Sequence, residues 1–341
     1  MKLRIVVRAL GLAGVALTLA GLPAVAESTL DLVKKRGQLN CGVNGELPGF
    51  SSRASSGWAG LDVDMCKAVA AAVLGDAGKV NFVPLTAQQR FTELQAGKVD
   101  MLARNSTITL QRDVGTEIDF TAVNFYDGQS FAVSKKIGVT APSGLGSSKI
   151  CVVKGTTHEA NMVNWFRARR YTIQPVPFDN AEAMYAAFFA SRCAGMTQDA
   201  TALAAVLATR NKQADYMVLP QLISREPLGP YVRRGDDAWV DIVRWSFQAM
   251  LLAEELNLTK DRVAGERQST DADVRQLLGT IPGNGKALGL EEDWAYNIIR
   301  QVGSYGESFD RNLGAGSPLK FERGANALWS KGGLMYPLPM R

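Results

Sequence analysis

Short apolar runs that suit β-strands alternate with longer runs that suit helices along much of this chain, and this alternation restricts the fold more than any other feature. Strands are expected at residues 39–43 and 80–84, with a helix at 61–74 between them. A second helix, at 90–95, leads into a further strand at 99–103. Apolar residues recur at helical spacing in the longer runs, whereas each strand is a short run. This order predicts an α/β fold with a mostly parallel sheet and right-handed crossovers.

The same alternation begins again near residue 129 and predicts a second sheet. A chain of 341 residues exceeds one comfortable core, so two lobes are expected. Polar residues follow directly after several strands in both series, which is typical of two lobes that face one cleft. The expected elements of the second series are strands at 130–133, 149–154, 173–177 and 194–198 and helices at 155–169, 181–190 and 200–210.

The N-terminus resembles an export signal. Three basic residues precede an apolar run that stops at Pro23, and Ala-Val-Ala at 24–26 is typical of a signal-peptidase site. We expect residues 1–26 to be a cleaved signal peptide. A single membrane anchor is the alternative, but the apolar run is barely long enough to span a bilayer. Loss of the three basic residues takes the formal charge from +5 to +2, which argues against a nucleic-acid partner.

Export allows the four cysteines to form disulfides, for which three connectivities exist. Cys41 lies in the first expected strand and Cys66 in the next helix, whereas Cys151 and Cys193 lie at the starts of two strands that can be neighbours. We therefore favour the pairs Cys41–Cys66 and Cys151–Cys193. A metal site is the competing interpretation, but the cysteines are far apart in sequence and His158 is the only histidine. We expect no metal.

The segment 97–113 predicts a buried strand that runs into a polar loop. Arg112 offers five rigid N–H donors that can grip a carboxylate in bidentate fashion, and Thr107 and backbone N–H groups can share that anion. The loop therefore suits a small anion. The alternative is that Arg112 is a surface residue at the start of a helix.

Two further strand ends carry polar residues that suit a ligand. Gly155-Thr156-Thr157 opens a helix, where free N–H groups and the helix dipole favour an anion, although the threonines can also be simple caps. Asp199 offers a carboxylate to an ammonium group, and its alternative role is the N-cap of the helix at 200–210. Together with Arg112 these groups match both charges of a zwitterion.

These motifs resemble family 3 of the extracellular solute-binding proteins, the periplasmic proteins that serve polar amino acid ABC importers. Gly-Leu-Asp-Val-Asp at 60–64, the segment 104–112, Gly-Thr-Thr at 155–157 and Gln-Asp at 198–199 follow the family's order and spacing. The tail from Ile281 resembles the general L-amino acid-binding subgroup. The resemblance implies a two-lobed periplasmic binding protein type 2 fold, with a mostly parallel sheet flanked by helices in each lobe and a hinge of two chain crossings.

The resemblance also implies an assignment of the chain to lobes. Residues 27–128 and 229–341 are expected in lobe 1, the second of these segments including a C-terminal extension, and residues 129–228 in lobe 2. The chain is expected to cross between the lobes near 128–131 and 227–231. We expect a periplasmic monomer without a cofactor that binds free L-amino acids and delivers them to the membrane permease of an ABC transporter.

Ligand contacts carried over from the family follow the matching motifs. Arg112 is expected to hold the α-carboxylate, with Thr107 and the region of Thr157 sharing it. Asp199 and the carbonyl of Asn105 are expected to hold the α-ammonium group. These contacts recognise the part that all amino acids have in common.

Other positions bear on the ligand side chain. In glutamate- and aspartate-binding relatives a basic residue near Arg90 meets that side chain, and Asn180 lies at another contact. Leu47 stands where binders of basic amino acids have a stacking aromatic residue, which Phe50 or Trp58 can replace. A cationic ligand is therefore disfavoured, and a broad or acidic and amide preference is expected.

An enzyme on the same fold is the competing function. Cyclohexadienyl dehydratases resemble these binding proteins but need a positioned acid for elimination, a role that Glu46 or Glu159 could serve. Neither has a recognisable catalytic setting. His158 lacks a second histidine or a nucleophile elbow, so we interpret it as a structural or pocket-rim residue. We expect no enzymatic activity.

Overall fold

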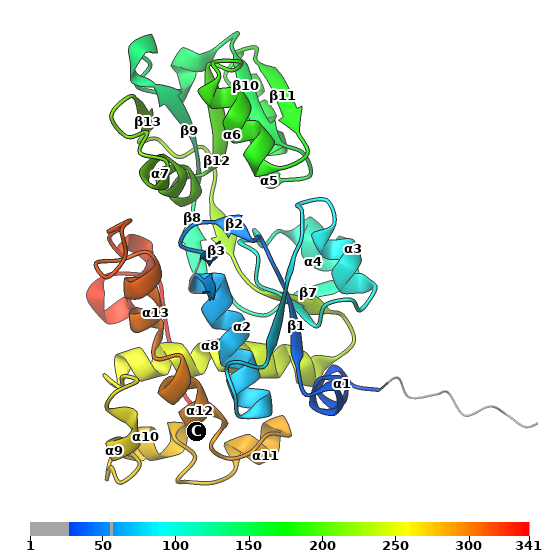
Figure 1. Cartoon of the computed structure of the whole chain (residues 1–341), viewed down its shortest axis with the longest axis vertical. Helices are drawn as coiled ribbons and strands as arrows, with labels where there is room; N and C mark the ends of the chain where they lie inside the picture. Colours follow the sequence, from blue (N-terminus) through cyan, green and yellow to red (C-terminus); the bar gives the residue numbers. More distant parts are fainter. Residues whose placement is uncertain (1–26, 55–56, 341) are drawn as a thin grey trace, which may run out of the picture.

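The computed structural model describes residues 27–54 and 57–340, which form two lobes joined by a narrow connection (Figure 1). The predicted signal peptide, residues 1–26, lies outside the described residues. None of the helices in the described part of the chain is long and apolar enough to cross a membrane.

The central sheet of lobe 1 has five strands in the order β5-β1-β6-β15-β7. β1 pairs in parallel with β5 and β6, and β15 is antiparallel to β6 and β7. Only β15, the strand that returns from lobe 2, opposes the others. The strands are β1 (Leu39–Val43), β5 (Val80–Pro84), β6 (Met101–Leu102), β7 (Ile118–Phe120) and β15 (Tyr231–Arg233).

The sheet of lobe 2 repeats this arrangement in the order β11-β10-β12-β9-β13. β10 is parallel to β11 and β12, and β9, which arrives from lobe 1, is antiparallel to β12 and β13. The prediction of two lobes with mostly parallel sheets is therefore confirmed. The strands are β9 (Gln129–Ser134), β10 (Lys149–Val153), β11 (Gln174–Phe178), β12 (Gly195–Asp199) and β13 (Tyr216–Val218).

The chain crosses between the lobes twice, as expected for this fold. β8 (Phe125–Asp127) leads into lobe 2 and β14 (Glu226–Leu228) leads back, and the two strands pair in antiparallel fashion. We call this pair the hinge. The exact lobe boundaries, placed at residues 128 and 228, stay a prediction.

Helices cover both faces of each sheet, so that apolar clusters form on either side (Figure 1). Lobe 1 also carries a small sheet of β2 (Glu46–Leu47), β3 (Ser51–Ala54) and β4 (Gly57–Ala59). Its helices are α1 (Thr29–Arg36), α2 (Leu61–Leu74), α3 (Arg90–Gln95), α4 (Leu110–Gly115) and α8 (Asp237–Glu255). Lobe 2 contains η1 (Lys135–Ile137), η2 (Pro142–Leu145), α5 (Thr157–Ala168), α6 (Ala181–Phe189) and α7 (Ala200–Thr209).

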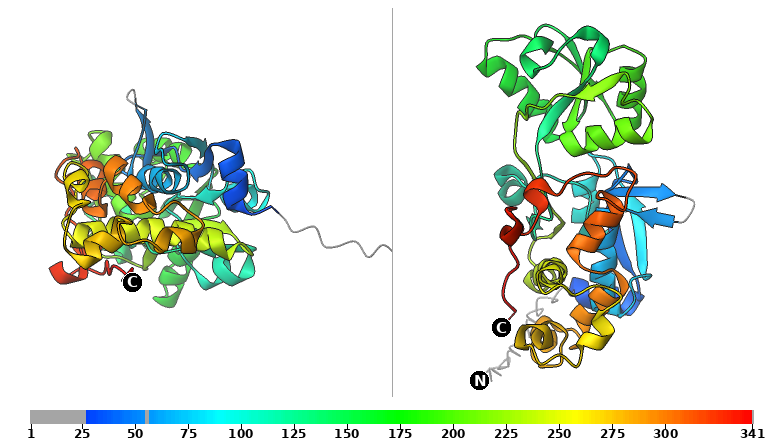
Figure 2. Two further views of the ribbon diagram at one scale, coloured as in Figure 1. Left: turned by 90° about the horizontal axis from the view of Figure 1, so that it is seen from below. Right: turned by 90° about the vertical axis from the view of Figure 1, so that its left-hand side faces the viewer.

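A C-terminal extension packs onto lobe 1 and runs beside the hinge (Figure 2). α2 is buried from Leu61 to Val73 at every position except Lys67, because α12 of the extension and α8 of lobe 1 cover sides that a two-layer lobe would leave exposed. The extension contains α9 (Val263–Glu266), α10 (Ala272–Leu277), α11 (Asn284–Leu288), α12 (Trp294–Gln301), α13 (Tyr305–Asn312), η3 (Gly324–Asn326) and η4 (Trp329–Lys331).

A buried carboxylate in α2 anchors the extension. Asp64 Oδ2 accepts hydrogen bonds from Ser308 Oγ at 2.7 Å and from the Arg311 and Asn312 side chains, all three in α13. The Tyr305 hydroxyl donates to the Asn124 carbonyl just before the hinge, at 2.9 Å. Asp64 is the second aspartate of the Gly-Leu-Asp-Val-Asp motif, so part of that motif serves the attachment of the extension.

Both predicted disulfides are present. Cys41 in β1 bonds to Cys66 in α2, and Cys151 in β10 bonds to Cys193 in the turn before β12, with Cα–Cα distances of 6.1 and 5.7 Å. The first bond fastens a helix to the lobe 1 sheet, and the second closes a segment of lobe 2. Such bonds stabilise a fold mainly by restricting the unfolded chain.

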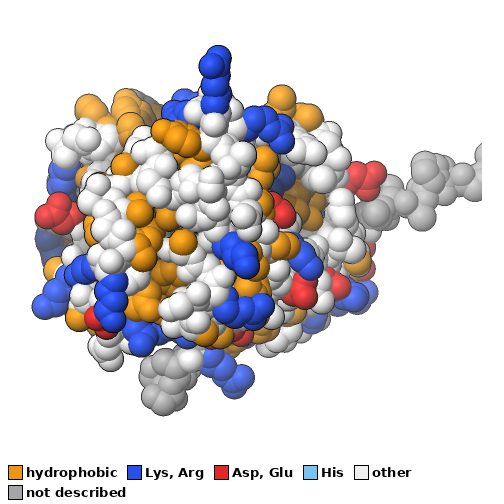
Figure 3. Space-filling view, turned by 90° about the horizontal axis from the view of Figure 1, so that it is seen from above, with side chains coloured by type: hydrophobic (Ala, Val, Ile, Leu, Met, Phe, Trp, Pro, Cys, Tyr) orange, Lys and Arg blue, Asp and Glu red, His pale blue; other side chains and the backbone are white. Residues whose placement is uncertain are grey.

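The outer end of lobe 2 carries lysine and arginine side chains that lie between uncharged and apolar ones (Figure 3). On this face they do not form the continuous basic stripe that is typical of a nucleic-acid-binding surface. The expectation of no nucleic-acid partner stays a prediction.

Candidate functional site

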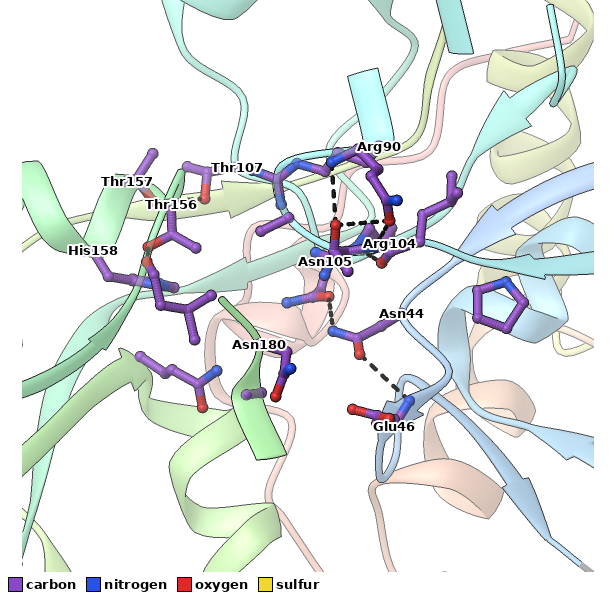
Figure 4. Close-up of a pocket in the computed structure, with 18 of the residues that line it drawn as sticks. Asn44, Glu46, Arg90, Arg104, Asn105, Thr107, Thr156, Thr157, His158 and Asn180 are labelled. Atoms are coloured by element: carbon purple, nitrogen blue, oxygen red, sulfur yellow. Dashed lines mark hydrogen bonds between the residues drawn. The ribbon is translucent and has the colours of Figure 1, made fainter. Parts of the chain in front are cut away.

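A cavity of about 310 Å³ lies between the lobes and is lined by residues of both (Figure 4). Its polar residues lie at or after the carboxyl ends of β1, β6, β10 and β12, or in the first turns of nearby helices, which is where α/β sheets bind ligands. Lobe 1 contributes Asn44, Arg90, Arg104, Asn105, Thr107 and Arg112. Lobe 2 contributes Thr156, Thr157, His158, Asn180 and Gln198.

The loop after β6 is held in shape by a carboxylate from α2. Asn105 adopts a left-handed conformation with φ of 37°, which asparagine tolerates better than most residues. Its N–H donates to Asp62 Oδ2 at 2.8 Å, and its Oδ1 accepts from Asn44 Nδ2 at 3.2 Å. Burial raises the pKa of Asp62 to about 7, against the lowering effects of this hydrogen bond and of Arg104. Asp62 therefore holds this loop in place through its hydrogen bond with the Asn105 N–H.

Arg112 is anchored to the same loop rather than lying free on the surface. Its Nη1 donates to the Thr107 carbonyl at 2.8 Å, and its guanidinium carbon lies 5.3 Å from the centre of the Phe91 ring. Burial lowers the pKa of Arg112, and the neighbouring Tyr231 and Glu226 oppose that shift. One nitrogen of the fork is thus fixed, which leaves the others for a ligand.

Two more guanidinium groups lie in the cavity wall. Arg90 and Arg104 are 3 % and 8 % exposed, and Figure 4 shows them beside Asn105. Arg104 Nε donates to the Leu85 carbonyl at 2.8 Å, whereas the buried Nε of Arg90 has no partner among the described residues. Burial and the nearby Arg104 and Arg112 lower the pKa of Arg90, and burial lowers that of Arg104 to about 10. The three guanidinium groups outnumber the two carboxylates that also line the cavity, Glu46 and Glu182, and this excess of positive charge favours an anionic ligand.

The lobe 2 threonines do not act as helix caps. Thr156 occupies the N-cap position of α5 but makes no side-chain cap, since its hydroxyl donates to the Val153 carbonyl at 2.8 Å. The Thr157 hydroxyl donates to Glu226 Oε2 at 2.9 Å, and the Thr107 hydroxyl donates to the same oxygen at 2.5 Å. The capping alternative therefore does not describe these residues.

His158 and Asp199 form a buried pair, with His158 Nε2 2.8 Å from Asp199 Oδ1. Burial lowers the pKa of His158, but the charge and hydrogen bond of Asp199 outweigh burial and raise it overall. Asp199 occupies the N-cap position of α7 without a capping hydrogen bond. Only His158 of this pair is among the residues that line the cavity, so Asp199 lies one side chain behind it.

The structure does not bring every predicted residue to the cavity. Phe50 is 1 % exposed and packs edge-on against Phe125 at 5.0 Å, so it belongs to the lobe 1 core and does not line the cavity. Trp58 packs against Phe82. Asn180 lines the cavity while its Oδ1 caps α6 by accepting from Ala183 N at 2.8 Å.

Two residues at or beside the cavity, Arg104 and Glu226, have no ligand role predicted from the sequence. Arg104 was visible as the residue after a buried strand, directly before the polar loop. Glu226 is 1 % exposed and stands directly before Pro227, at the second chain crossing. No local sequence pattern marks it as a site residue. Of the two acids considered for an enzyme, Glu46 lines the cavity and Glu159 does not.

Among the residues that the structure describes, His158, Asp199 and Glu226 form the group that could offer metal ligands, since one ligand atom of each lies within 4.8 Å of the others. Their atoms are already engaged. His158 bonds to Asp199, and the two oxygens of Glu226 accept from Thr107, Thr157, Asn161 and Ser224. A hydrogen-bond network accounts for the cluster, and the expectation of no metal stays a prediction.

Comparison with known proteins identifies the family to which this fold belongs. The model of bacterial extracellular solute-binding proteins, family 3, matches residues 39–266. The general L-amino acid-binding periplasmic protein AapJ of Rhizobium johnstonii is 45 % identical over 331 residues, which cover 96 % of this chain and 97 % of that protein. The glutamate/glutamine/aspartate/asparagine-binding protein BztA of Rhodobacter capsulatus is 49 % identical over 321 residues, which cover 93 % and 95 %.

Solved structures agree. A periplasmic binding protein from Brucella ovis with glutathione bound has a TM-score of 0.90 and 46 % identity, covering 92 % of this chain and 100 % of that one. These relatives are named as binding proteins, which disfavours the dehydratase alternative. The chain therefore belongs to family 3 of the bacterial extracellular solute-binding proteins.

Proposed function

We propose that this protein is a periplasmic receptor that binds free L-amino acids between its lobes and delivers them to the permease of an ABC importer. The observation that carries the proposal is the cavity in which Arg112 and two threonine-bearing loops from different lobes meet. The names of the relatives from Rhizobium johnstonii and Rhodobacter capsulatus support it. Cleavage of residues 1–26, periplasmic location and a monomeric state are parts of the proposal.

The common part of the ligand is assigned to groups at strand ends. Arg112 holds the α-carboxylate through its free guanidinium nitrogens, together with backbone N–H groups near Thr107 and Thr157, because both threonine hydroxyls give their protons to Glu226. The α-ammonium group is held by the Asn105 carbonyl and by the His158–Asp199 pair, where Asp199 supplies the negative charge. Charge-assisted hydrogen bonds of this kind are stronger than neutral ones, so they suit the capture of a zwitterion.

The ligand side chain is assigned to Arg90, Arg104 and Asn180. Three guanidinium groups around one cavity exceed what a single α-carboxylate requires. A second carboxylate would offset the repulsion between these cations. We therefore propose a preference for L-glutamate and L-aspartate, followed by their amides.

A γ-glutamyl peptide is a second ligand class that the same charges favour. Glutathione, which is bound to the Brucella ovis relative, has two carboxylates and one ammonium group. Its two carboxylates could both pair with the three guanidinium groups that line the cavity. The two classes differ in length and therefore make different demands on the cavity.

A thermal-shift screen tests the proposal. Mature protein is heated with each of the twenty L-amino acids, with D-glutamate and with glutathione. A ligand that binds only the folded state raises the melting temperature by mass action. We expect the largest shift with an acidic amino acid and little shift with D-glutamate. No shift with any L-amino acid at millimolar concentration would refute the proposed function, and a larger shift with glutathione would reassign the ligand.

The dehydratase alternative is tested in parallel by incubation with prephenate or arogenate. A binding protein leaves both unchanged, because it lacks a positioned acid that could drive elimination. Formation of phenylpyruvate or phenylalanine above the buffer rate would contradict the assignment as a receptor.

A further inference from the structure

Glu226 lies in the hinge strand β14 and is 1 % exposed, yet its carboxylate receives four hydrogen bonds. Oε2 accepts from the hydroxyls of Thr107, at 2.5 Å, and Thr157, at 2.9 Å. Oε1 accepts from Asn161 Nδ2, at 2.7 Å, and from the Ser224 hydroxyl. These donors leave the carboxylate well satisfied, although it is buried.

The two threonines that bind Oε2 come from different lobes. Thr107 lies in the loop after β6 of lobe 1, and Thr157 is the first residue of α5 in lobe 2. Their hydroxyl oxygens are 3.4 Å apart, and Figure 4 shows both residues at one end of the cavity. One hinge carboxylate thus accepts a hydrogen bond from one cavity residue of each lobe.

Glu226 itself lies behind these residues. It lines a neighbouring groove and is not among the residues that line the cavity, whereas Thr107 and Thr157 line both. The threonines therefore form the wall between the cavity and the groove, with Glu226 on the groove side. Glu226 can therefore affect a ligand in the cavity only through the two threonines or through the electrostatic effect of its charge.

We infer that Glu226 is a positioning residue for ligand binding, a hinge-borne acceptor that holds Thr107 and Thr157 in the orientation that the closed cavity needs. The inference rests on the proposed function. Each threonine hydroxyl has one proton, which it gives to Glu226, so any further hydrogen bond that the hydroxyl forms is one that it accepts. Glu226 thereby determines the polarity as well as the position of this wall, and preorganisation of this kind strengthens binding.

Two conservative variants separate position from charge. Glu226→Gln removes the charge but keeps an oxygen acceptor for the two threonines at the same distance from the backbone. The new amide N–H groups can donate to Asn161, whose amide can turn to accept, and to the Ser224 hydroxyl. Glu226→Asp keeps the charge but withdraws the carboxylate by one methylene. Positioning predicts that the glutamine variant binds more tightly than the aspartate variant. A purely electrostatic role predicts the reverse order.

The test is calorimetric titration of the mature protein with L-glutamate. We expect Glu226→Gln to bind within about threefold of wild type and Glu226→Asp to bind about tenfold more weakly, roughly the worth of one hydrogen bond. Glu159→Gln and Glu159→Asp are matched controls, because Glu159 lies in α5 but not at the cavity, and they should bind as wild type does. Circular dichroism confirms that each variant is folded.

A mutant cycle makes the route explicit. If Glu226 acts through Thr107 and Thr157, Glu226→Asp should cost little further affinity in a background that carries both Thr107→Val and Thr157→Val, so the losses do not multiply. The inference is overturned if the losses multiply, if Glu226→Asp binds as tightly as wild type, or if it binds more tightly than Glu226→Gln. Failure of wild-type protein to bind L-glutamate or any other amino acid is a different result, which refutes the proposed function itself.

Discussion

The side-chain amide of Asn326 pairs with the backbone of Tyr126 in both directions. The Tyr126 N–H donates to Asn326 Oδ1 at 2.7 Å, and Asn326 Nδ2 donates to the Tyr126 carbonyl at 3.0 Å. Tyr126 lies in the hinge strand β8, and Asn326 lies in η3 of the C-terminal extension. The extension thus binds directly to one of the two strands that connect the lobes.

Asn326→Ala should lower the free energy of unfolding by about 1–3 kcal/mol, because it leaves two part-buried backbone groups without their partners. Urea denaturation of the mature protein measures this loss. Glu322→Ala is a matched control on the same segment, since Glu322 is exposed and makes no side-chain hydrogen bond among the described residues. Equal stability of the two variants would show that the amide contributes nothing to the fold.

The ionisation of His158 should reveal its bond to Asp199. His158 is the only histidine of the chain, so NMR can follow one imidazole signal without assignment. We expect a pKa above the ordinary value of about 6.5. Asp199→Asn should bring the pKa below that value, because burial alone lowers it.

The same shift predicts how stability depends on pH. A raised folded-state pKa means that the folded protein binds the His158 proton more tightly than the unfolded chain does. The resulting stabilisation is fully present below pH about 6.5 and is lost as the pH rises through the folded-state pKa. Asp199→Asn should reverse this dependence, because a folded-state pKa below the ordinary value makes the protein gain stability as the pH rises. An unchanged His158 titration in the variant would contradict the pairing.

Asp62 gives a second pH prediction, with a sign unusual for a carboxyl group. Its folded-state pKa is raised to about 7, so the wild type should lose stability as the pH rises from about 4 to about 7. Asp62→Asn still accepts from the Asn105 N–H but does not titrate. The variant should therefore gain stability relative to the wild type across this window. Urea denaturation at several pH values measures the difference, and a constant difference would show that Asp62 stays ionised throughout.

Regular elements could be predicted from the sequence because their signals are local. The helix at 61–74 is bounded by Gly60 and Gly75 and was predicted with the observed ends. The strand expected at 99–103 is observed as Met101–Leu102, although backbone hydrogen bonds from Asp100 N to Asn40 and from Ala103 N to Gly42 extend its pairing. The disulfide pairs followed from the same local signals.

The residues of the cavity wall could be predicted only where they belong to a sequence motif. Phe50 lies near a strand end and could face either the cleft or the core, and its partner Phe125 is remote in sequence. Glu226 receives hydrogen bonds from Thr107 and Thr157, which precede it by 119 and 69 residues. No local pattern distinguishes such a residue from a solvated glutamate, because its burial depends on how the lobes meet.

We expect the two lobes to close when an amino acid binds, because two lobes can bury a zwitterion fully only by approaching each other. Binding energy is then realised in the closed state, which becomes the dominant population. Small-angle X-ray scattering should give a smaller radius of gyration with saturating L-glutamate than without it. An unchanged radius would mean that the lobes are fixed, which would contradict a receptor that reports occupancy by its shape.

Capture of the α-carboxylate by Arg112 is the central claim, and calorimetric titration of Arg112→Ala with L-glutamate tests it most directly. The variant removes the partner of a desolvated carboxylate, a loss of about 3 kcal/mol or more, which corresponds to at least about a hundredfold weaker binding. Arg112→Lys should also bind poorly, because an ammonium group cannot reproduce the bidentate fork. Arg275→Ala, an exposed arginine of α10, should bind as wild type does. Binding by folded Arg112→Ala within threefold of the wild type would contradict the assignment of the site.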